Sequence, residues 1–393
     1  HMNNTRRPPL SFLIGALLLA AALLTLFLLD RPLAAAQALT LPEPGGDALA
    51  ATYHPGSQPY GVILLEGFGS DQVTMRSLAR PFVLGGWHVL SFDFSGHGRS
   101  PGALDFDNAQ TDRLARQTLA ALDEFSRLSG LPPERIYLAG HSLGARVALQ
   151  SAVLSPLRLG GLILLGTQVN LSTNVQSEFF TGTTDSSLDW VGALGPQTPA
   201  AQILMVSGDW DDILTPEAAG LLYTRLSAGQ DGAFTREKVI LSGLVHNYEP
   251  FSPRVWEAVR AWLARQTGAD LPGSGGQTAR VLAWLGGLVG LLLFAAGAEA
   301  WAAAALPAVP ASANGAQITS LPRFLRAKLL LWLGALPLAA VLGGVFFFLP
   351  LAKPVFNLIY VGFIGGYGLL LLILYWRGKM PGVRGSLWAG ETA

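Results

Sequence analysis

One serine lies in a context typical of a nucleophile. Ser142 is the centre of Gly140-His141-Ser142-Leu143-Gly144, a Gly-x-Ser-x-Gly pattern. In this pattern the serine occupies a strained turn between a strand and a helix, and small flanking residues let the turn form. The strand-like run "RIYLAG" precedes the turn and the helix-forming run "LGARVALQSAV" follows it. The pattern therefore predicts a serine that can attack a carbonyl carbon.

A second serine matches the same pattern, so context must separate the two. Ser100 lies in "GRSPG" (98–102), and 46 glycines among 393 residues make chance matches common. The Pro-Gly pair after Ser100 cannot open a long helix. We therefore interpret Ser100, and His97 near it, as loop residues that follow a strand.

An activated serine needs a base and a carboxylate that orients the base. His246 in "LSGLVHNYEP" is the only histidine downstream of Ser142, and it lies just past a strand-like run. Three aspartates compete for the acid, because Asp209, Asp211 and Asp212 all follow the run "QILMVSG". Spacing from the strand leaves the choice among them open.

Apolar runs alternate with helical ones through the middle of the chain and predict the elements that hold these residues. The strand-like runs are 49–53, 61–67, 88–94, 136–140, 161–167, 202–208 and 238–243. The helical runs are 73–84, 110–128, 143–154, 216–226 and 252–266. Strands that are apolar throughout are typical of a parallel sheet buried on both faces. Their alternation with helices predicts a doubly wound, mostly parallel α/β sheet.

The middle of the chain, which holds these predicted elements, differs from the chain ends in its content of apolar residues. Lys+Arg and Asp+Glu number 26 each, which gives no basic excess for nucleic acid, and the absence of cysteine excludes disulfides and thiolate chemistry. Charged residues make up only 13% of the chain. The apolar excess falls in four runs long enough to span a membrane as helices, one N-terminal and three C-terminal. The runs are 10–29, 281–298, 329–351 and 355–376.

The first run could be a cleaved signal peptide or a retained anchor. Arg6 and Arg7 would form the basic region of a signal, and small residues follow in "LAAAQA". However, the twenty apolar residues from Leu10 to Leu29 exceed the usual signal core of about 7–15 residues. We therefore expect a retained anchor.

Three groups of basic residues flank the four runs on the same side, whereas Arg280 and Lys353 lie near run ends on the other side. The positive-inside rule places the side of the three groups in the cytoplasm of a plasma (inner) membrane, with both termini, 1–9 and 377–393, cytoplasmic. The block 30–266 is then extracytoplasmic, and 267–280 is expected to be a flexible linker to a three-helix region, 281–376. The residues of the three groups are Arg6, Arg7, Arg323, Arg326, Lys328, Arg377, Lys379 and Arg384.

Five segments resemble, in order, the successive signatures of the α/β-hydrolase superfamily. They are "LLEGFGS", "SFDFSGHGRSPG", "AGHSLG", "GDWDDILTP" and "GLVHNYEP", and the likeness covers roughly 40–266. It is closest to the monoacylglycerol-lipase-like and serine-aminopeptidase-like esterases. The resemblance implies an α/β-hydrolase fold and acyl transfer through an acyl-serine. No cofactor and no metal are expected.

The resemblance also assigns the acid. In the family pattern G-x-x-D-x-[IV]-[VL]-x-P the acid is the fourth residue, which is Asp211 here, with Asp212 as the second choice. The implied triad is Ser142, Asp211 and His246. In such enzymes His246 would take the serine proton and Asp211 would orient the imidazole.

The implied oxyanion hole contains one departure from the family. Its donors map to the backbone N–H groups of Leu143 and Phe68. Glu66 stands where the family usually has a histidine, and a carboxylate beside a developing oxyanion is unfavourable. We therefore expect Glu66 to point away or to be neutralised, with Arg99 or Arg146 as its partner.

Residues 168–201 fall where the family inserts its cap, and their shortness predicts either a small cap over an open site or a plain loop. A tethered catalytic block favours substrates delivered from the bilayer, so we expect lipid or lipid-like acyl esters. Two alternatives remain: a peptidase or amidase of the same fold, and a non-catalytic hydrolase-like binding domain on a membrane protein. The expected partners are the lipid bilayer and a small-molecule or lipid ester.

Overall fold

The computed structural model describes two compact units of the chain. One is 24–283, which carries the sheet, and the other is 1–23 together with 284–393, which carries apolar helices. The division falls inside two long helices. The described residues are 7–42, 48–102, 109–167, 169, 186–229, 234–305, 329–338, 341–342, 362–370 and 373.

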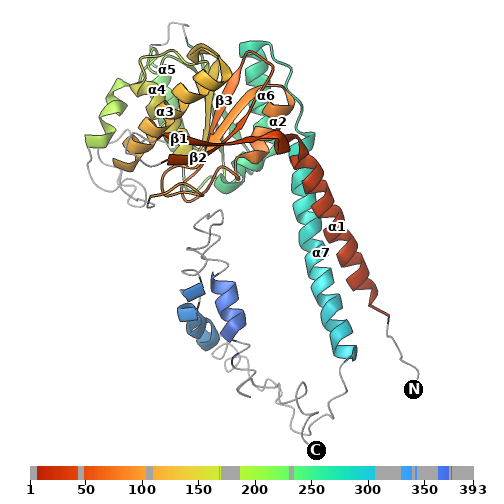
Figure 1. The fold of residues 1–393 in the computed structure, drawn as a ribbon. Coiled ribbons are helices and arrows are strands. Elements are labelled where there is room, and N and C mark those ends of the chain that lie inside the picture. Colours follow the sequence, from red (N-terminus) through yellow and green to blue (C-terminus); the bar gives the residue numbers. More distant parts are fainter. Residues whose placement is uncertain are drawn as a thin grey trace, which may run out of the picture. The chain divides into compact units, whose positions relative to one another are not determined.

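An eight-stranded sheet forms the centre of the unit 24–283, with strand order β1-β2-β4-β3-β5-β6-β7-β8 (Figure 1). β1 and β2 pair antiparallel, as do β2 and β4, and all other neighbours are parallel. This confirms the predicted, mostly parallel α/β sheet. The strands are β1 (Gln37–Pro42), β2 (Ala48–His54), β3 (Gly61–Leu65), β4 (His88–Phe92), β5 (Ile136–His141), β6 (Gly161–Leu165), β7 (Gln202–Gly208) and β8 (Arg236–Leu241).

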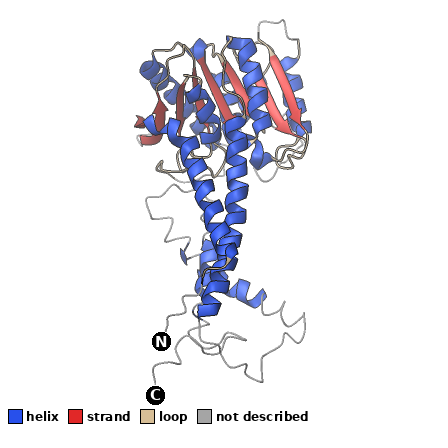
Figure 2. Ribbon diagram, turned by 90° about the vertical axis from the view of Figure 1, so that its right-hand side faces the viewer, coloured by secondary structure: helices blue, strands red, loops and turns tan. Residues whose placement is uncertain are grey.

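Helices cover both faces of this sheet (Figure 2). One face carries α3 (Ala109–Ser129), α4 (Leu143–Leu154) and α5 (Pro216–Ser227). The opposite face carries α2 (Arg76–Leu84) and α6 (Pro253–Thr267). Four short 3-10 helices complete the described elements, η1 (Arg31–Ala35), η2 (Pro133–Arg135), η3 (Ser186–Ala193) and η4 (His246–Phe251).

The central strands contribute side chains to two hydrophobic cores, one on each face of the sheet. Every residue of β3 is buried, with Ile63 and Leu65 in the core under α3 and α4 and with Val62 and Leu64 in the core under α2 and α6. Successive side chains of a strand point to opposite faces, which is why an unbroken apolar run is needed here. Burying each such side chain contributes about 1.5–3 kcal/mol.

Strand β1 was not predicted from the sequence. Its residues, "QALTLP", include few that favour a strand, and only Leu41 among them is buried. The strand pairs with β2 alone, at the edge of the sheet. Its conformation depends on that pairing more than on local propensity.

Among the described residues, two helices are long and apolar enough to cross a membrane, judged by length and composition: α1 (Leu10–Asp30) and α7 (Gly275–Ala305). Within the unit that holds residues 1–23 and 284–305 they pack closely at glycines. A Cβ atom on Gly15, Gly290 or Gly297 would clash with the opposite helix. Small residues allow such a close approach of two helices in a membrane.

The prediction of a flexible linker at 267–280 is wrong for the second half of that segment, because α7 begins at Gly275. Tertiary contacts within the unit 24–283 hold this segment in place. The Gln277 side chain donates to a backbone carbonyl of α2 at 3.1 Å, and Arg280 forms an ion pair with Asp30. The glycines and the serine in the sequence of this segment do not indicate these contacts.

Several predicted segments lie wholly or partly outside the described residues. The described parts of the third and fourth apolar runs are helical, and the number of spans stays a prediction. Half of the expected cap, 168–201, is also outside, and its described residues are 169 and 186–201. Residues 1–6 and the basic groups at 323–328 and 377–384 are outside as well.

Candidate active site

Ser142 stands in the sharp turn that joins β5 to α4. Its φ of 56° is the one positive value at a non-glycine position among the described residues. The Ser142 N–H donates to the Leu165 carbonyl of β6 at 2.9 Å, which holds the turn against the sheet. Residues kept in such sparsely populated regions cost about 1–3 kcal/mol and cluster at functional sites.

The glycines on either side of Ser142 are required by close backbone contact. A Cβ atom on Gly140 would clash with the backbone of Gly144. A Cβ atom on Gly144 would clash with the carbonyls at the end of β3. The turn can therefore form only where both positions are glycine, as the pattern predicts.

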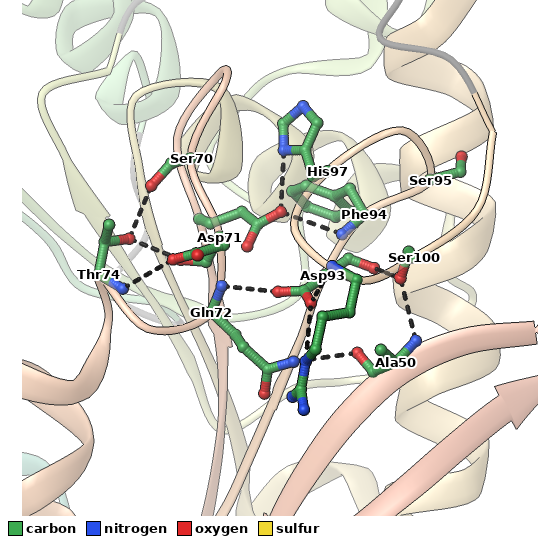
Figure 3. A network of polar contacts seen from close by, with 12 residues as sticks. Ala50, Ser70, Asp71, Gln72, Thr74, Asp93, Phe94, Ser95, His97 and Ser100 are labelled. Carbon is green, nitrogen blue, oxygen red and sulfur yellow. Dashed lines mark hydrogen bonds and ion pairs between the residues drawn. The ribbon is translucent and has the colours of Figure 1, made fainter. Parts of the chain in front are cut away.

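The rival serine has a structural role (Figure 3). The Ser100 hydroxyl donates to the Asp93 carbonyl at 2.6 Å and accepts from the Ala50 N–H at 3.0 Å. It therefore ties the loop after β4 to β2, and both its donor and its acceptor capacity are used.

The structure brings one of the three competing aspartates to His246. The Asp211 carboxylate accepts from His246 Nδ1 at 2.7 Å, and both side chains are buried. Its other oxygen accepts from the N–H groups of Ile213 and Leu214. Asp209 and Asp212 are exposed. Of the three aspartates, Asp211 is thus the one that the structure places in contact with His246.

His141 links the histidine loop to the serine turn. Its Nε2 lies 3.1 Å from the His246 carbonyl oxygen, and the two imidazole rings are 4.7 Å apart. In the described structure no hydrogen bond joins the Ser142 hydroxyl to His246. Such bonds are often long in enzymes without substrate and tighten when substrate binds.

The two candidate oxyanion donors lie on either side of the serine. Leu143 is the first residue of α4, so its N–H has no acceptor within the helix. Gly67, which precedes Phe68, packs so closely that a Cβ atom there would lie 3.6 Å from Ser142 Cβ. The loop after β3 therefore reaches the serine turn.

The Glu66 side chain lies in a buried network. Its Oε1 lies 2.8 Å from His97 Nδ1 and accepts from the Phe94 N–H at 3.0 Å. The expected arginine partners are wrong: no hydrogen bond or ion pair joins Glu66 to Arg99 or Arg146 among the described residues. His97, and not an arginine, is thus the partner of the Glu66 side chain. Its sequence context indicated only a loop residue.

Burial neutralises this pair. Burial, and then the charge of Asp93, raises the pKa of Glu66 well above its ordinary value. Burial also lowers the pKa of His97 to about 4. A carboxyl group that stays neutral removes the repulsion expected between Glu66 and a developing oxyanion.

A second buried carboxyl group lies beside the His246–Asp211 pair. Glu249 in η4 accepts from the Gly208 N–H at 3.0 Å, and its other oxygen is 3.7 Å from His141 Nε2. Burial, and then the charge of Asp211, raises the pKa of Glu249 to about 9. Sequence reasoning missed this residue, whose one signal is its place three positions after His246.

The donor atoms of His141, His246 and Glu249 lie within 4.8 Å of one another. Most of these groups already have partners within the protein. His141 bonds the His246 backbone, His246 Nδ1 bonds Asp211, and Glu249 bonds the N–H of Gly208. The cluster therefore fits a hydrogen-bonded support for the histidine better than an open coordination site.

Comparison with known proteins shows a similarity to one family over part of the chain. A family model, Hydrolase_4, described as serine aminopeptidase S33, matches residues 58–203. The match runs from near β3 to the start of β7, so it includes Ser142 and ends before Asp211 and His246.

Curated relatives match over shorter stretches. The chain is 30% identical over 140 residues to the dihydrolipoyllysine-residue acetyltransferase component of an acetoin cleaving system from Pseudomonas putida, covering 36% of this chain and 35% of that protein. It is also 30% identical over 108 residues to a 2-hydroxy-6-oxononadienedioate/2-hydroxy-6-oxononatrienedioate hydrolase from Cupriavidus pinatubonensis, covering 27% of this chain and 35% of that protein. The chain thus spans about a third of the length of these relatives.

Among solved structures, an esterase from Pyrococcus furiosus is 17% identical with a TM-score of 0.48, covering 61% of this chain and 93% of that one. An α/β serine hydrolase without a lid from Xanthomonas campestris is 22% identical with a TM-score of 0.42, covering 61% of this chain and 96% of that one. Residues 58–203 are thus similar to a family of serine hydrolases, and the strained serine turn lies within the matched part.

Proposed function

We propose that the chain is a membrane-anchored serine hydrolase that cleaves carboxylic esters, with lipid or lipid-like acyl esters as its substrates. The observation that carries the proposal is the set of side chains at the ends of β5, β7 and β8. The residue before the strained serine, His141, contacts the buried His246, and His246 is 2.7 Å from a buried carboxylate. A serine, a histidine base and a carboxylate are the three groups that acyl transfer to serine requires.

The first half of the reaction forms an acyl-serine. His246 accepts the Ser142 proton as the hydroxyl oxygen attacks the ester carbonyl carbon, and Asp211 orients and stabilises the resulting imidazolium. The N–H groups of Leu143 and Phe68 would donate to the oxyanion of the tetrahedral intermediate. The intermediate collapses, and the alcohol leaves with the proton from His246.

The second half releases the acid. A water molecule attacks the acyl-serine carbonyl carbon while His246 takes one of its protons. The C–O bond to Ser142 breaks, the serine regains its proton from His246, and the carboxylic acid departs. The same groups thus act in both halves with acid and base roles exchanged.

Two serine variants test the proposal. Ser142→Ala should abolish turnover of a short-chain ester while melting within a few degrees of the parent, because the packing change is slight. Ser100→Ala should retain most of the activity. A dead Ser100→Ala variant beside an active Ser142→Ala variant would contradict the assignment.

A peptidase of the same fold is the second candidate, and the description of the family model as a serine aminopeptidase favours it. The same triad can attack an amide. Comparison of kcat/KM for an ester and for the matched aminoacyl amide separates the two. Esters should be preferred, and a preference for the amide would replace the esterase proposal. Activity on neither substrate, without reaction at Ser142, would favour a binding domain.

Membrane anchoring by α1 and α7 supports a substrate delivered from the bilayer. We place the hydrolase block outside an inner membrane with both termini in the cytoplasm, on the one-sided distribution of basic residues. A reporter fused after Ala393 should therefore read cytoplasmic, and protease added to spheroplasts should reach the block. An extracytoplasmic signal from that fusion would reject this orientation.

A further inference from the structure

A small cavity lies between β2, β4, the start of α2 and η1. Its volume is about 70 Å³, and its polar lining consists of Thr52, His54, Gln72, Arg76, Ser91 and Arg99. This volume is several times the roughly 10–15 Å³ that one water molecule needs. None of these residues belongs to the proposed catalytic machinery.

The buried wall of the cavity carries polar groups that are not fully hydrogen-bonded. His54 is only 6% exposed, yet its ring makes no hydrogen bond with any residue that the structure describes. Ser91 is buried, and its hydroxyl makes only a long contact of 3.5 Å with Gln72. Buried polar groups are normally hydrogen-bonded, so these donors have capacity left for a ligand.

Two arginines line the cavity at exposed positions. Within the described parts of the chain the Arg76 side chain has neither an ion pair nor a hydrogen bond. The positive charge of Arg76 is close enough to His54 to lower the pKa of that histidine, in addition to the effect of burial. Arg99 Nε is 3.9 Å from the Asp93 carboxylate.

Both nearby carboxylates accept backbone hydrogen bonds, and Asp93 also forms an ion pair with Arg99 (Figure 3). Asp93 accepts from the backbone N–H groups of Gln72 and Arg99, at 2.8 Å each. Asp71 accepts from the N–H groups of Val73 and Thr74. Neither carboxylate is among the residues that line the cavity.

The cavity also lies close to the end of a candidate membrane span. Leu33 and Ala36 line it, and they follow the last residue of α1, Asp30, by three and six positions. A chain reaches at most roughly 3.6 Å per residue, so these lining residues are within about 20 Å of that end. One helical turn after Arg76, the Arg80 Nε donates to the carbonyl of Leu29 in α1 at 2.7 Å.

We propose that this cavity binds a phosphate group, presented by an anionic phospholipid at the membrane surface. Guanidinium groups recognise phosphate through paired, charge-assisted hydrogen bonds, which suits Arg76 and Arg99. The Ser91 and Thr52 hydroxyls and the His54 ring supply neutral donors behind them. The phosphate site does not depend on the hydrolase chemistry, whereas the lipid source rests on the membrane anchoring proposed above.

The test titrates the full-length chain, in a neutral detergent, with three probes followed by native mass spectrometry. The probes are short-chain phosphatidic acid, the matched diacylglycerol without the phosphate, and inorganic phosphate. Phosphatidic acid should bind more tightly than diacylglycerol. Arg76→Gln and Arg99→Gln should each weaken that binding by about tenfold, the order expected for one charge-assisted hydrogen bond.

Arg116→Gln is the matched control, because Arg116 is an exposed arginine of α3 on the opposite face of the sheet. It should leave the affinity unchanged, and melting curves check that each variant is folded. Inorganic phosphate binding as tightly as phosphatidic acid, and sensitive to Arg76→Gln, would support the site but assign it a free anion and reject the lipid source. The proposal is overturned if phosphatidic acid binds no better than diacylglycerol and inorganic phosphate does not bind. It also fails if neither arginine variant changes the affinity.

Discussion

At the scale of single residues, the proposed site depends on two buried carboxyl groups with different environments. Asp211 accepts three hydrogen bonds, from His246 and from two backbone N–H groups. Glu249 accepts one, from Gly208, and its Oε2 has no hydrogen-bond donor in the described structure. A carboxylate with many donors suits the charged partner of an imidazolium, whereas a poorly satisfied one is better neutral. The two acids therefore have separate tasks.

The first prediction concerns the charged acid. Asp211→Asn should lower kcat for ester hydrolysis by about 10⁴-fold, because the histidine loses its orienting carboxylate. Asp209→Asn and Asp212→Asn should stay within a few-fold of the parent, since both side chains are exposed. Steady-state kinetics of the three variants checks this. Equal losses at all three positions would leave Asp211 without a special role.

The second prediction concerns the neutral acid. The pKa of Glu249 is about 9 in the folded chain and near 4.5 when unfolded. Its contribution to stability is therefore complete below pH 4.5 and is lost as the pH rises towards 9, at about 1.4 kcal/mol per pH unit. Glu249→Gln keeps a neutral acceptor for Gly208 and removes this loss. Its melting temperature should exceed that of the parent at pH 8 and lie close to it at pH 5.

Glu217→Gln is the control for that comparison, because Glu217 is exposed on α5. It should follow the parent at both pH values. The account of Glu249 fails if Glu249→Gln melts below the parent by the same amount at pH 5 and pH 8, since the group would then contribute only a contact. Turnover of the variant reports separately on whether Glu249 helps to position His246.

At the scale of elements, a third prediction concerns the pairing of α1 with α7. A Cβ atom on Gly290 would lie 2.9 Å from Leu18 Cβ, whereas nothing lies within 4 Å of the same position on Gly286. Gly290→Leu should therefore separate the helices and lower the melting temperature of the full-length chain in detergent. Gly286→Leu should have little effect. Equal melting of the two variants would show that the helices do not pack through this face.

Some elements were predictable from the sequence and some were not. Apolar runs predicted seven of the eight strands, and the central ones, which are buried on both faces, need unbroken apolar sequence. The serine turn was predictable because its glycines are required locally. β1 and the start of α7 were missed because tertiary contacts, such as the Arg280–Asp30 pair, hold them in place. Glu249 and the Glu66–His97 contact were missed because they depend on which loops meet in space.

At the scale of the whole molecule, the fourth prediction concerns the limits of the hydrolase block. A fragment 38–268 contains the triad but lacks Leu33 and Leu271, which are buried in the core against α2 and α6. Each such side chain contributes about 1.5–3 kcal/mol. The fragment 24–283 should therefore melt at a higher temperature than 38–268 in thermal unfolding, and both should hydrolyse a short-chain ester. Equal melting temperatures would mean that the flanking segments add nothing to the block.

The central claim is that an acyl group is transferred to Ser142, with His246 as the base. The most direct measurement is mass spectrometry of peptides from the full-length chain after reaction with a fluorophosphonate, which traps activated serines. The account predicts one adduct, on the peptide that contains Ser142, and its loss in His246→Ala. An adduct on the peptide that contains Ser100, or no adduct on a folded chain, would contradict the account.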